Sequence, residues 1–195
     1  MGKSISKVVV IDQNMGRAQV LVDGLREAGI EDVTLIRNGE NLLTKVVALN
    51  PDVILIDLEN PRRDTVEQML RVSEQVQRPV VMFADESEPD LIRRAVQSGV
   101  SAYIVDGLQK ARLKSIIEVA VARFNQFETM EGEVARLRQE LDDRKVIEKA
   151  KGLLMRSRAL SEEDAHAFLR RAAMNEKKKI IDIANLVIEA DKVGL

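Results

Sequence analysis

Cysteine and tryptophan are both absent from this chain of 195 residues. Without cysteine the protein forms neither disulfides nor thiolate metal sites, and we expect it in a reducing cytoplasm. Aromatic residues make up only 3% of the sequence, with a single tyrosine. We therefore do not expect a surface that stacks nucleic-acid bases on aromatic rings. Any contact with nucleic acid must depend on charge and shape.

Long apolar runs are missing as well. No window approaches the roughly 18 uninterrupted apolar residues of a membrane-spanning helix. Only the four apolar residues Val8–Ile11 precede Asp12, and that run is too short for the core of a signal peptide. We expect a soluble, cytoplasmic protein with no membrane partner.

Patterns of catalytic and metal-binding residues are also lacking. His166 is the single histidine, so no second imidazole or thiol accompanies it in a metal site. No nucleophile is paired with a base, and no glycine-rich loop is present to hold a phosphate. The sequence favours a protein that is not an enzyme and has no resident metal or cofactor.

Charge is distributed unevenly along the chain. The formal net charge is only −2 and the hydrophobic fraction is 45%, enough for a packed core. Between Arg144 and Lys179, however, the sequence has eleven basic and five acidic residues, while the remainder is acidic. This asymmetry predicts two regions with different roles.

Short β-branched runs alternate with stretches of helical period in the first part of the chain. The runs are Val8–Ile11, Val33–Ile36, Val53–Ile56, Val80–Phe83 and Tyr103–Val105. The helical stretches between them are Met15–Ala28, Asn41–Leu49, Thr65–Val76 and Pro89–Ser98. Strands that are apolar on both faces and alternate with helices are typical of a covered parallel sheet. The pattern predicts a five-stranded, parallel, doubly wound α/β domain over residues 1–123.

One long helix is predicted from Gln109 to Arg158, because this stretch has no proline and only two glycines. Within it, apolar residues are spaced by three and four positions, namely Phe127, Met130, Val134, Leu137 and Leu141. This short heptad seam favours a two-stranded coiled coil over residues 124–143, and therefore a homodimer. The alternative is a single helix that lays the same stripe on its own N-terminal domain.

Residues 144–195 are predicted to form an all-α unit of three helices. Its first helix is the end of the long one, its second begins at Ser161 with a capping-box-like spacing to Asp164, and its third begins near Lys178. Such a small unit is marginally stable without a neighbour or a dimer partner.

Two aspartates stand at the ends of predicted strands, Asp12 in Val-Val-Val-Ile-Asp-Gln-Asn and Asp57 in Asp-Val-Ile-Leu-Ile-Asp-Leu. With this pattern, residues 5–123 resemble the receiver domain of response regulators. The resemblance implies a site in which Asp12 helps to bind Mg²⁺ and Asp57 accepts a phosphoryl group. The alternative is that Asp57 merely ends a strand.

Three departures from the receiver pattern weaken that site. Gln13 replaces the second acidic residue, Ala84 the hydroxyl residue, and Asp106-Gly107 the Lys-Pro pair. Losing a carboxylate weakens Mg²⁺ binding, and Asp106 adds negative charge where the family has an ammonium group. We expect a pseudo-receiver that is not phosphorylated and binds Mg²⁺ weakly at most. A working phosphoacceptor is the alternative.

A second sequence pattern covers residues 144–190. It begins with Arg-Lys-Val-Ile-Glu-Lys-Ala-Lys-Gly-Leu-Leu-Met at 144–155 and continues with Ser-Glu-Glu-Asp-Ala at 161–165 and Leu-Arg-Arg-Ala-Ala-Met at 169–174. This pattern resembles the ANTAR domain. The resemblance implies an RNA-binding antiterminator that binds paired hairpins with six-nucleotide loops in a leader mRNA. Binding then prevents an overlapping terminator from forming.

Basic residues and one glycine in this region are the predicted RNA contacts. They are Arg144, Lys145, Lys149, Lys151, Gly152, Arg156, Arg170, Lys177, Lys178 and Lys179. A glycine on an exposed helix face costs about 1 kcal/mol relative to alanine, which close approach of RNA or of another chain explains. Positive charge at the start of the last helix opposes the helix dipole, so the three consecutive lysines suggest phosphate contacts. The alternative is a merely solvated basic face.

A pseudo-receiver, a coiled coil and an ANTAR domain in one chain are similar to the nitrate-responsive antiterminators and, less closely, to those of amidase operons. The segments 83–88 and 100–108 carry the closer resemblance. It implies control of nitrate or nitrite assimilation genes, and a ligand-binding sensor protein that holds the regulator inactive. Two other classes stay open, a phosphorelay regulator whose helical output binds DNA or protein, and an interaction adaptor without a nucleic-acid role.

Overall fold

The computed structural model describes residues 5–37, 41–58, 63–85, 88–105 and 109–193. The chain divides into two compact units, residues 1–128 and 129–195. The predicted boundaries at 123/124 and 143/144 both fall inside one continuous helix, which they do not interrupt.

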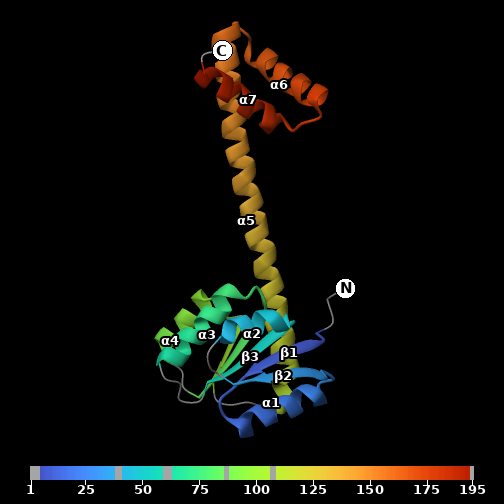
Figure 1. The fold of residues 1–195 in the computed structure, drawn as a ribbon, viewed down its shortest axis with the longest axis vertical. Helices are drawn as coiled ribbons and strands as arrows, with labels where there is room; N and C mark the ends of the chain where they lie inside the picture. The colour runs from blue at the N-terminus through green and yellow to red at the C-terminus, as the bar shows by residue number, and fades with distance from the viewer. Residues whose placement is uncertain (1–4, 38–40, 59–62, 86–87, 106–108, 194–195) are drawn as a thin grey trace. The chain divides into compact units, whose positions relative to one another are not determined.

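The first unit contains a parallel sheet whose strands were predicted from the β-branched runs. The strands are β1 (Lys7–Ile11), β2 (Asp32–Ile36), β3 (Val53–Leu58), β4 (Val80–Ala84) and β5 (Ala102–Val105). They pair in the order β2-β1-β3-β4-β5, and every pairing is parallel. The predicted five-stranded doubly wound fold is therefore confirmed (Figure 1).

Helices cover both faces of this sheet. They are α1 (Met15–Glu27), α2 (Leu42–Leu49), α3 (Arg63–Gln75), α4 (Pro89–Gln97) and the start of α5 (Lys110–Arg158). Buried side chains of α1 and α5 pack on one face, whereas those of α2, α3 and α4 pack on the other. The middle strands β3 and β4 are buried along their whole length, while the edge strands β2 and β5 are half-buried. Removal of these apolar side chains from water drives the packing.

Glycines end two of the covering helices. Gly29 follows α1 with φ +86° and Gly99 follows α4 with φ +84°. Both backbones lie in the left-handed region, which glycine adopts without a steric penalty and which terminates a helix. Each turn then returns the chain to the sheet, so that the next strand starts in register.

The helix α5 is 49 residues long, as the absence of proline predicted. Its last part packs with α6 (Glu162–Glu176) and α7 (Ile180–Val193) around a second apolar core. The members of that core are Ala150, Leu154, Ala165, Leu169, Ala173, Ile183 and Ala184. Ser161 caps α6, since its Oγ accepts a hydrogen bond from the Asp164 backbone N–H at 3.1 Å. No described helix combines the length and the apolar character that a bilayer span requires.

Candidate functional site

Carboxylates gather at the carboxyl edge of the sheet, where β1, β3 and β4 end side by side. Asp12 directly follows β1, Asp57 is the second-last residue of β3, and Asp85 directly follows β4. Asp12 and Asp57 are each only 5% exposed. Crevices at this edge are where ligands bind in open α/β folds, so this is the first candidate site.

Arg17 lies among these carboxylates, and the sequence analysis did not identify it; we call Asp12, Arg17, Asp57 and Asp85 the carboxylate pocket. From the first turn of α1 its Nε donates to Asp57 Oδ2 at 2.9 Å and its Nη2 to Asp57 Oδ1 at 2.8 Å. Its Nη1 also lies 3.0 and 2.9 Å from the two carboxylate oxygens of Asp85. A signal was present in the sequence. The first turn of α1 has a basic residue and no acidic one, although a positive charge opposes the helix dipole there.

The ionisation of the pocket follows from these contacts. Hydrogen bonds to Asp85 and Asp57 raise the pKa of Arg17 above its ordinary value. Burial raises the pKa of Asp12, and the nearby charge of Asp57 adds to this effect. Asp12 Oδ1 accepts a hydrogen bond from the Asn14 backbone N–H at 2.7 Å, while its buried Oδ2 has no hydrogen-bond partner.

The residues present do not fit the Mg²⁺ site that a receiver domain implies. Both oxygens of Asp57 already accept hydrogen bonds from a cationic group, whereas Mg²⁺ requires near-octahedral oxygen ligands. Ala84 ends β4 with a buried methyl group in place of a hydroxyl. Among the described residues, no group of three or more acidic or histidine side chains is arranged to hold a metal. Asp106 and Gly107 lie outside the described residues.

The second candidate site is a basic face on the last part of α5. Lys145, Lys149, Gly152 and Arg156 follow one another at spacings of four, three and four residues, so a helix of 3.6 residues per turn places them on one face. The three charged side chains are exposed, and the buried residue Ala150 lies on another face of the helix. We call these four residues the basic face.

Gly152 is not required by the packing of its own chain. A Cβ added at this position meets only Arg156 Nη1, at an ordinary contact distance of 3.8 Å. Among the described residues of the unit, none therefore compensates for the low helix propensity of glycine. An approaching molecule that needs the space is consistent with this finding.

Most of the predicted RNA contacts have no ion-pair partner in the described part of the chain. Among the described residues, no ion pair engages Arg144, Lys149, Arg156, Arg170, Lys177 or Lys179. Lys145 pairs with Asp142 at 2.8 Å and Lys178 with Glu176 at 2.7 Å. These two pairs are exposed, and exposed pairs contribute little and exchange readily with other partners.

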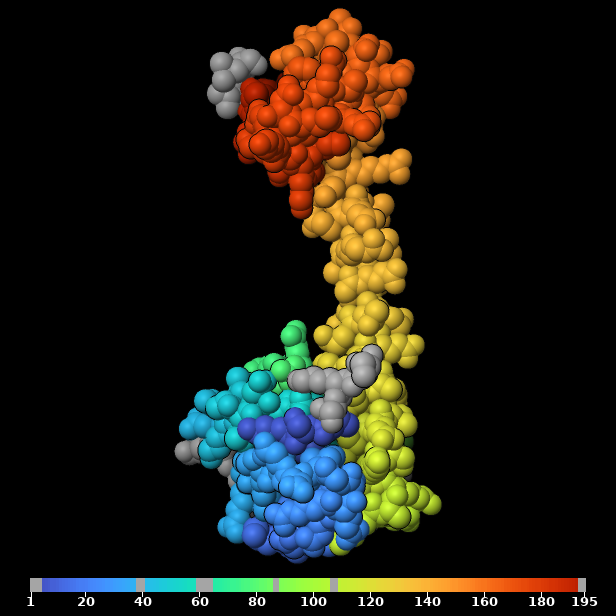
Figure 2. Space-filling view, turned by 90° about the vertical axis from the view of Figure 1, so that its right-hand side faces the viewer, coloured from blue at the N-terminus to red at the C-terminus, as the bar shows by residue number. Residues whose placement is uncertain are grey.

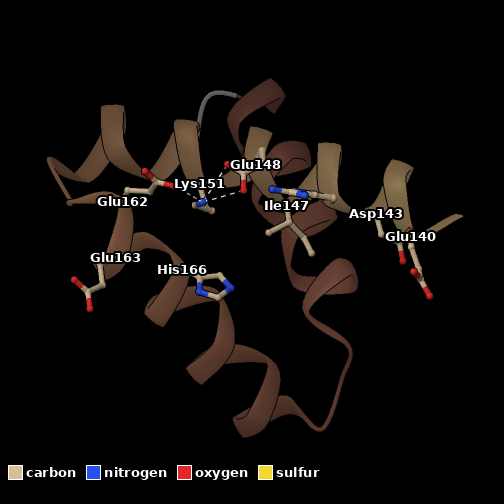
Figure 3. A pocket seen from close by; sticks show the side chains of 9 residues that line it. Glu140, Asp143, Ile147, Glu148, Lys151, Glu162, Glu163 and His166 are labelled. Atoms are coloured by element: carbon tan, nitrogen blue, oxygen red, sulfur yellow. Dashed lines mark hydrogen bonds and ion pairs between the residues drawn. The ribbon is translucent and has the colours of Figure 1, made fainter. Parts of the chain in front are cut away.

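Lys151 was predicted to contact RNA, but the structure buries its side chain and so removes it from the predicted RNA surface. It is only 7% exposed, and its Nζ lies 2.9 Å from Glu148 Oε1 and 2.7 Å from Glu162 Oε1 (Figure 3). Hydrogen bonds to Glu162 and Glu148 raise the pKa of Lys151, and the Lys151 ammonium lowers the pKa of Glu162. Lys151 follows Ile147 by one helical turn, so it points towards α6 and ties the two helices together.

An acidic groove of about 640 Å³ lies around this ion pair. Figure 3 shows the side chain of His166 pointing into it. Its lining consists of Glu140, Asp143, Arg144, Ile147, Glu148, Lys151, Glu162, Glu163 and His166. Five of these residues are acidic, so the groove does not attract phosphate groups. Arg144, a predicted RNA contact, lies at this groove and not on the basic face.

The last helix begins two residues later than predicted, so the lysine tract lies between α6 and α7. Lys177 is the C-cap of α6 with φ +53°, and α7 begins only at Ile180. Positive charge at the end of α6 agrees with its dipole, so the expectation that the tract opposes helix stability was wrong for Lys177. The expectation that positive charge opposes the helix dipole still holds for Lys179, which directly precedes α7. Its backbone N–H donates to Asp182 Oδ2 at 3.1 Å.

The ion pair of Lys151 leads to a prediction for stability. We expect Lys151→Ala to lower the midpoint of thermal unfolding more than Lys149→Ala, since the two changes remove the same atoms but only Lys151 is buried and paired. Because Lys151 lowers the pKa of Glu162, the pair contributes fully above the ordinary glutamate value of 4.5 and is lost as pH falls through the lowered pKa. Circular dichroism melts at neutral and acidic pH measure both effects. Equal midpoints at neutral pH would contradict the prediction.

Both sites fall in regions that match known families. Residues 8–118 match the response regulator receiver domain and residues 135–188 match the ANTAR domain. The chain therefore belongs to the ANTAR-domain response regulators, a class of regulatory proteins in which a receiver domain precedes an ANTAR domain.

Individual relatives agree with this assignment. The chain is 34% identical over 169 residues to the transcriptional regulatory protein PdtaR of Mycobacterium tuberculosis. The aligned region covers 87% of this chain and 82% of that protein. The chain is 31% identical over 75 residues to the nitrate regulatory protein of Klebsiella oxytoca, covering 38% of this chain and 19% of that protein. The solved structure of the chemotaxis response regulator CheY4 of Vibrio cholerae is similar with a TM-score of 0.52, at 20% identity over 60% of this chain and 99% of that one. The last similarity supports the receiver fold alone.

Proposed function

We propose that this chain is a non-enzymatic, RNA-binding transcription antiterminator. Its ANTAR domain binds paired hairpins with six-nucleotide loops in a leader mRNA and so keeps an overlapping terminator from forming. The observation that carries the proposal is the basic face, in which Lys149, Gly152 and Arg156 combine unpaired charge with an uncompensated glycine on one side of α5. Cationic side chains around a position without a side chain suit a phosphate backbone that approaches the helix closely.

The mode of recognition follows from what the second unit contains. Phe168 is the only aromatic residue in residues 129–195, and the Arg158 guanidinium lies over its ring at 4.7 Å from the ring centre. Base stacking on an aromatic platform is therefore not a means of recognition here. The RNA is bound by contacts to phosphates, by hydrogen bonds to the loop bases and by the shape of the hairpin.

We also propose that the active form is a homodimer. The seam residues Phe127, Met130, Val134, Leu137 and Leu141 are between 45% and 59% exposed. Figure 2 shows this stretch of α5, coloured yellow to orange. With the seam at the a and d positions of the heptad, Glu133 takes a g position and Arg138 takes an e position. In a parallel pair of helices Glu133 then faces Arg138 of the second copy.

Dimerisation matches the proposed RNA. Two ANTAR domains held by one coiled coil present two basic faces, and the leader contains two hairpins. Linking two binding events in this way raises the overall affinity without any new contact.

The target and the signal are proposed from the relatives and from the pocket. Similarity to a nitrate regulatory protein supports control of nitrate or nitrite assimilation genes. A pocket in which Asp57 is paired with Arg17 favours control by a protein partner over control by a kinase. We therefore propose that a ligand-binding sensor protein sequesters the regulator until an inducer releases it.

The proposal is tested by RNA binding of the full chain. We expect tighter binding to a leader RNA with two hexaloop hairpins than to the same RNA with permuted loop bases or with one hairpin deleted. Filter binding or gel shift at fixed salt measures the difference. A chain that binds an unrelated hairpin with equal affinity is not an antiterminator of this kind, whatever its charge.

A further inference from the structure

Arg17 joins the three elements that surround the carboxylate pocket. It starts from α1, and its guanidinium binds Asp57 of β3 and Asp85 after β4, which lie 40 and 68 residues away in the sequence. Four hydrogen-bond contacts of 2.8 to 3.0 Å hold it there. The contact with Asp57 is the paired, two-pronged geometry in which arginine binds carboxylates most strongly.

Burial explains why this pocket needs a cation. The Asp57 side chain is 1% exposed, and an ionised carboxylate at such a depth is costly unless a positive charge neutralises it. Asp85 is 36% exposed and its charge adds to the demand. A divalent metal ion between the two carboxylates would neutralise their charge, and the Arg17 guanidinium does so in this structure.

We infer that Arg17 is the resident cation of the pocket, that it takes the place of a divalent metal, and that it holds the ends of β3 and β4 together without metal or phosphate. The pocket is therefore closed permanently by the protein itself. Its state does not change with the concentration of Mg²⁺ or of a phosphodonor.

Two observations indicate that Arg17 and a metal ion cannot bind Asp57 at the same time. Both Asp57 oxygens are hydrogen-bonded to Arg17, so a metal must displace the guanidinium to gain its ligands. Asp12 Oδ2 is the one buried side-chain oxygen without a partner in the described part of the chain. A single free oxygen is too little for Mg²⁺, which needs several, and the guanidinium repels a second cation.

The same contacts oppose phosphorylation of Asp57. Hydrogen bonds to a cation draw electron density from both carboxylate oxygens, which makes either one a weaker nucleophile. The opposite role is an outcome of the test, since arginine also binds phosphate well. If Arg17 stabilises a phosphorylated Asp57, then removal of Arg17 decreases labelling of the pocket.

The first measurement is thermal unfolding of the full chain with and without Mg²⁺. Arg17→Gln removes the cation, and Arg26→Gln, at an exposed position of the same helix, is the matched control. We expect no Mg²⁺ effect on the wild type or the control. Arg17→Gln should unfold at a lower temperature and be partly restored by Mg²⁺. Stabilisation of the wild type by Mg²⁺ to the same degree as Arg17→Gln would overturn the inference.

The second measurement is metal binding itself, with Mn²⁺ as the probe and electron paramagnetic resonance as the readout. We expect Arg17→Gln to bind Mn²⁺ at least about tenfold more tightly than the wild type, because a neighbouring positive charge acts on a divalent ion even through water. If Arg17→Gln does not fold, Asp85→Asn serves instead. It leaves the Arg17–Asp57 pair intact, so it should unfold somewhat earlier than the wild type and still not respond to Mg²⁺.

The third measurement is labelling by acetyl phosphate. We expect acetyl phosphate not to label the wild type, because Arg17 holds both carboxylate oxygens of Asp57. Efficient labelling of the wild type that is lost in Arg17→Gln would assign the arginine to a phosphate site and contradict the inference.

Discussion

Replacing Leu137 and Leu141 by glutamate should convert the proposed dimer into a monomer. Four carboxylates then meet along the seam of each dimer, and burying an unpaired carboxylate costs several kcal/mol. We expect the dimer to dissociate at concentrations about a hundredfold higher or more than for the wild type. Both leucines are half exposed in the single chain, so the fold of each unit should be unchanged. Light scattering at several concentrations measures the effect.

A matched control adds the same charges outside the seam. Gly132 and Ala135 lie on the opposite side of α5 from Leu137 and Leu141, and a side chain at Gly132 meets nothing within 4 Å. The variant with glutamate at both positions should remain a dimer. RNA binding should follow the oligomeric state, since a monomer can hold only one hairpin at a time. The dimer hypothesis fails if the wild type is monomeric even when it is bound to RNA.

Changes on the basic face should separate the role of charge from the role of space. Lys149→Ala and Arg156→Ala each remove a cation that no described residue pairs with, so each should weaken RNA binding. Each should also reduce the slope of log affinity against log salt by roughly 0.7 on single-stranded loops or 0.9 on duplex stems. Lys114→Ala, at an exposed position of α5 in the first unit, is the control and should change neither quantity.

Gly152→Leu should raise the thermal stability of the second unit and lower its affinity for RNA. The helix gains about 1 kcal/mol when glycine is replaced by a good helix former, and the space around a Cβ is open except for the flexible end of Arg156. RNA affinity should nevertheless fall, with an unchanged salt slope, because the new side chain occupies the space of the approaching molecule. Melting curves and salt titrations on the same samples test both halves. An unchanged affinity would show that the glycine has no part in binding.

Local patterns were sufficient for the secondary structure. Five β-branched runs became five strands, and a stretch without proline became the 49-residue helix α5. The Ser161 cap was found in the same way, because its hydrogen bond to Asp164 spans only three residues. These features depend on side-chain period and on turn chemistry within a few residues, which a sequence displays directly.

The basic residues in the sequence did not by themselves show which of their side chains are exposed and free to bind. Lysines 149 and 151 look alike in a run of basic residues, yet one is exposed and the other is buried between Glu148 and Glu162. The difference is two residues on a helix, about 200° of rotation, together with the presence of α6 on one side. Only the packing of α6 against α5 decides which lysine remains available.

The sequence by itself determined the order of elements, the parallel sheet and the position of a basic helical region, because these follow from periodicity and composition. Only the tertiary structure decided what occupies the carboxylate pocket. Arg17, Asp57 and Asp85 meet because β1, β3 and β4 are neighbours in the sheet and α1 begins at the same edge. Contacts across 40 and 68 residues have no local pattern. They arise where distant chain segments fold together and a buried carboxylate requires a partner.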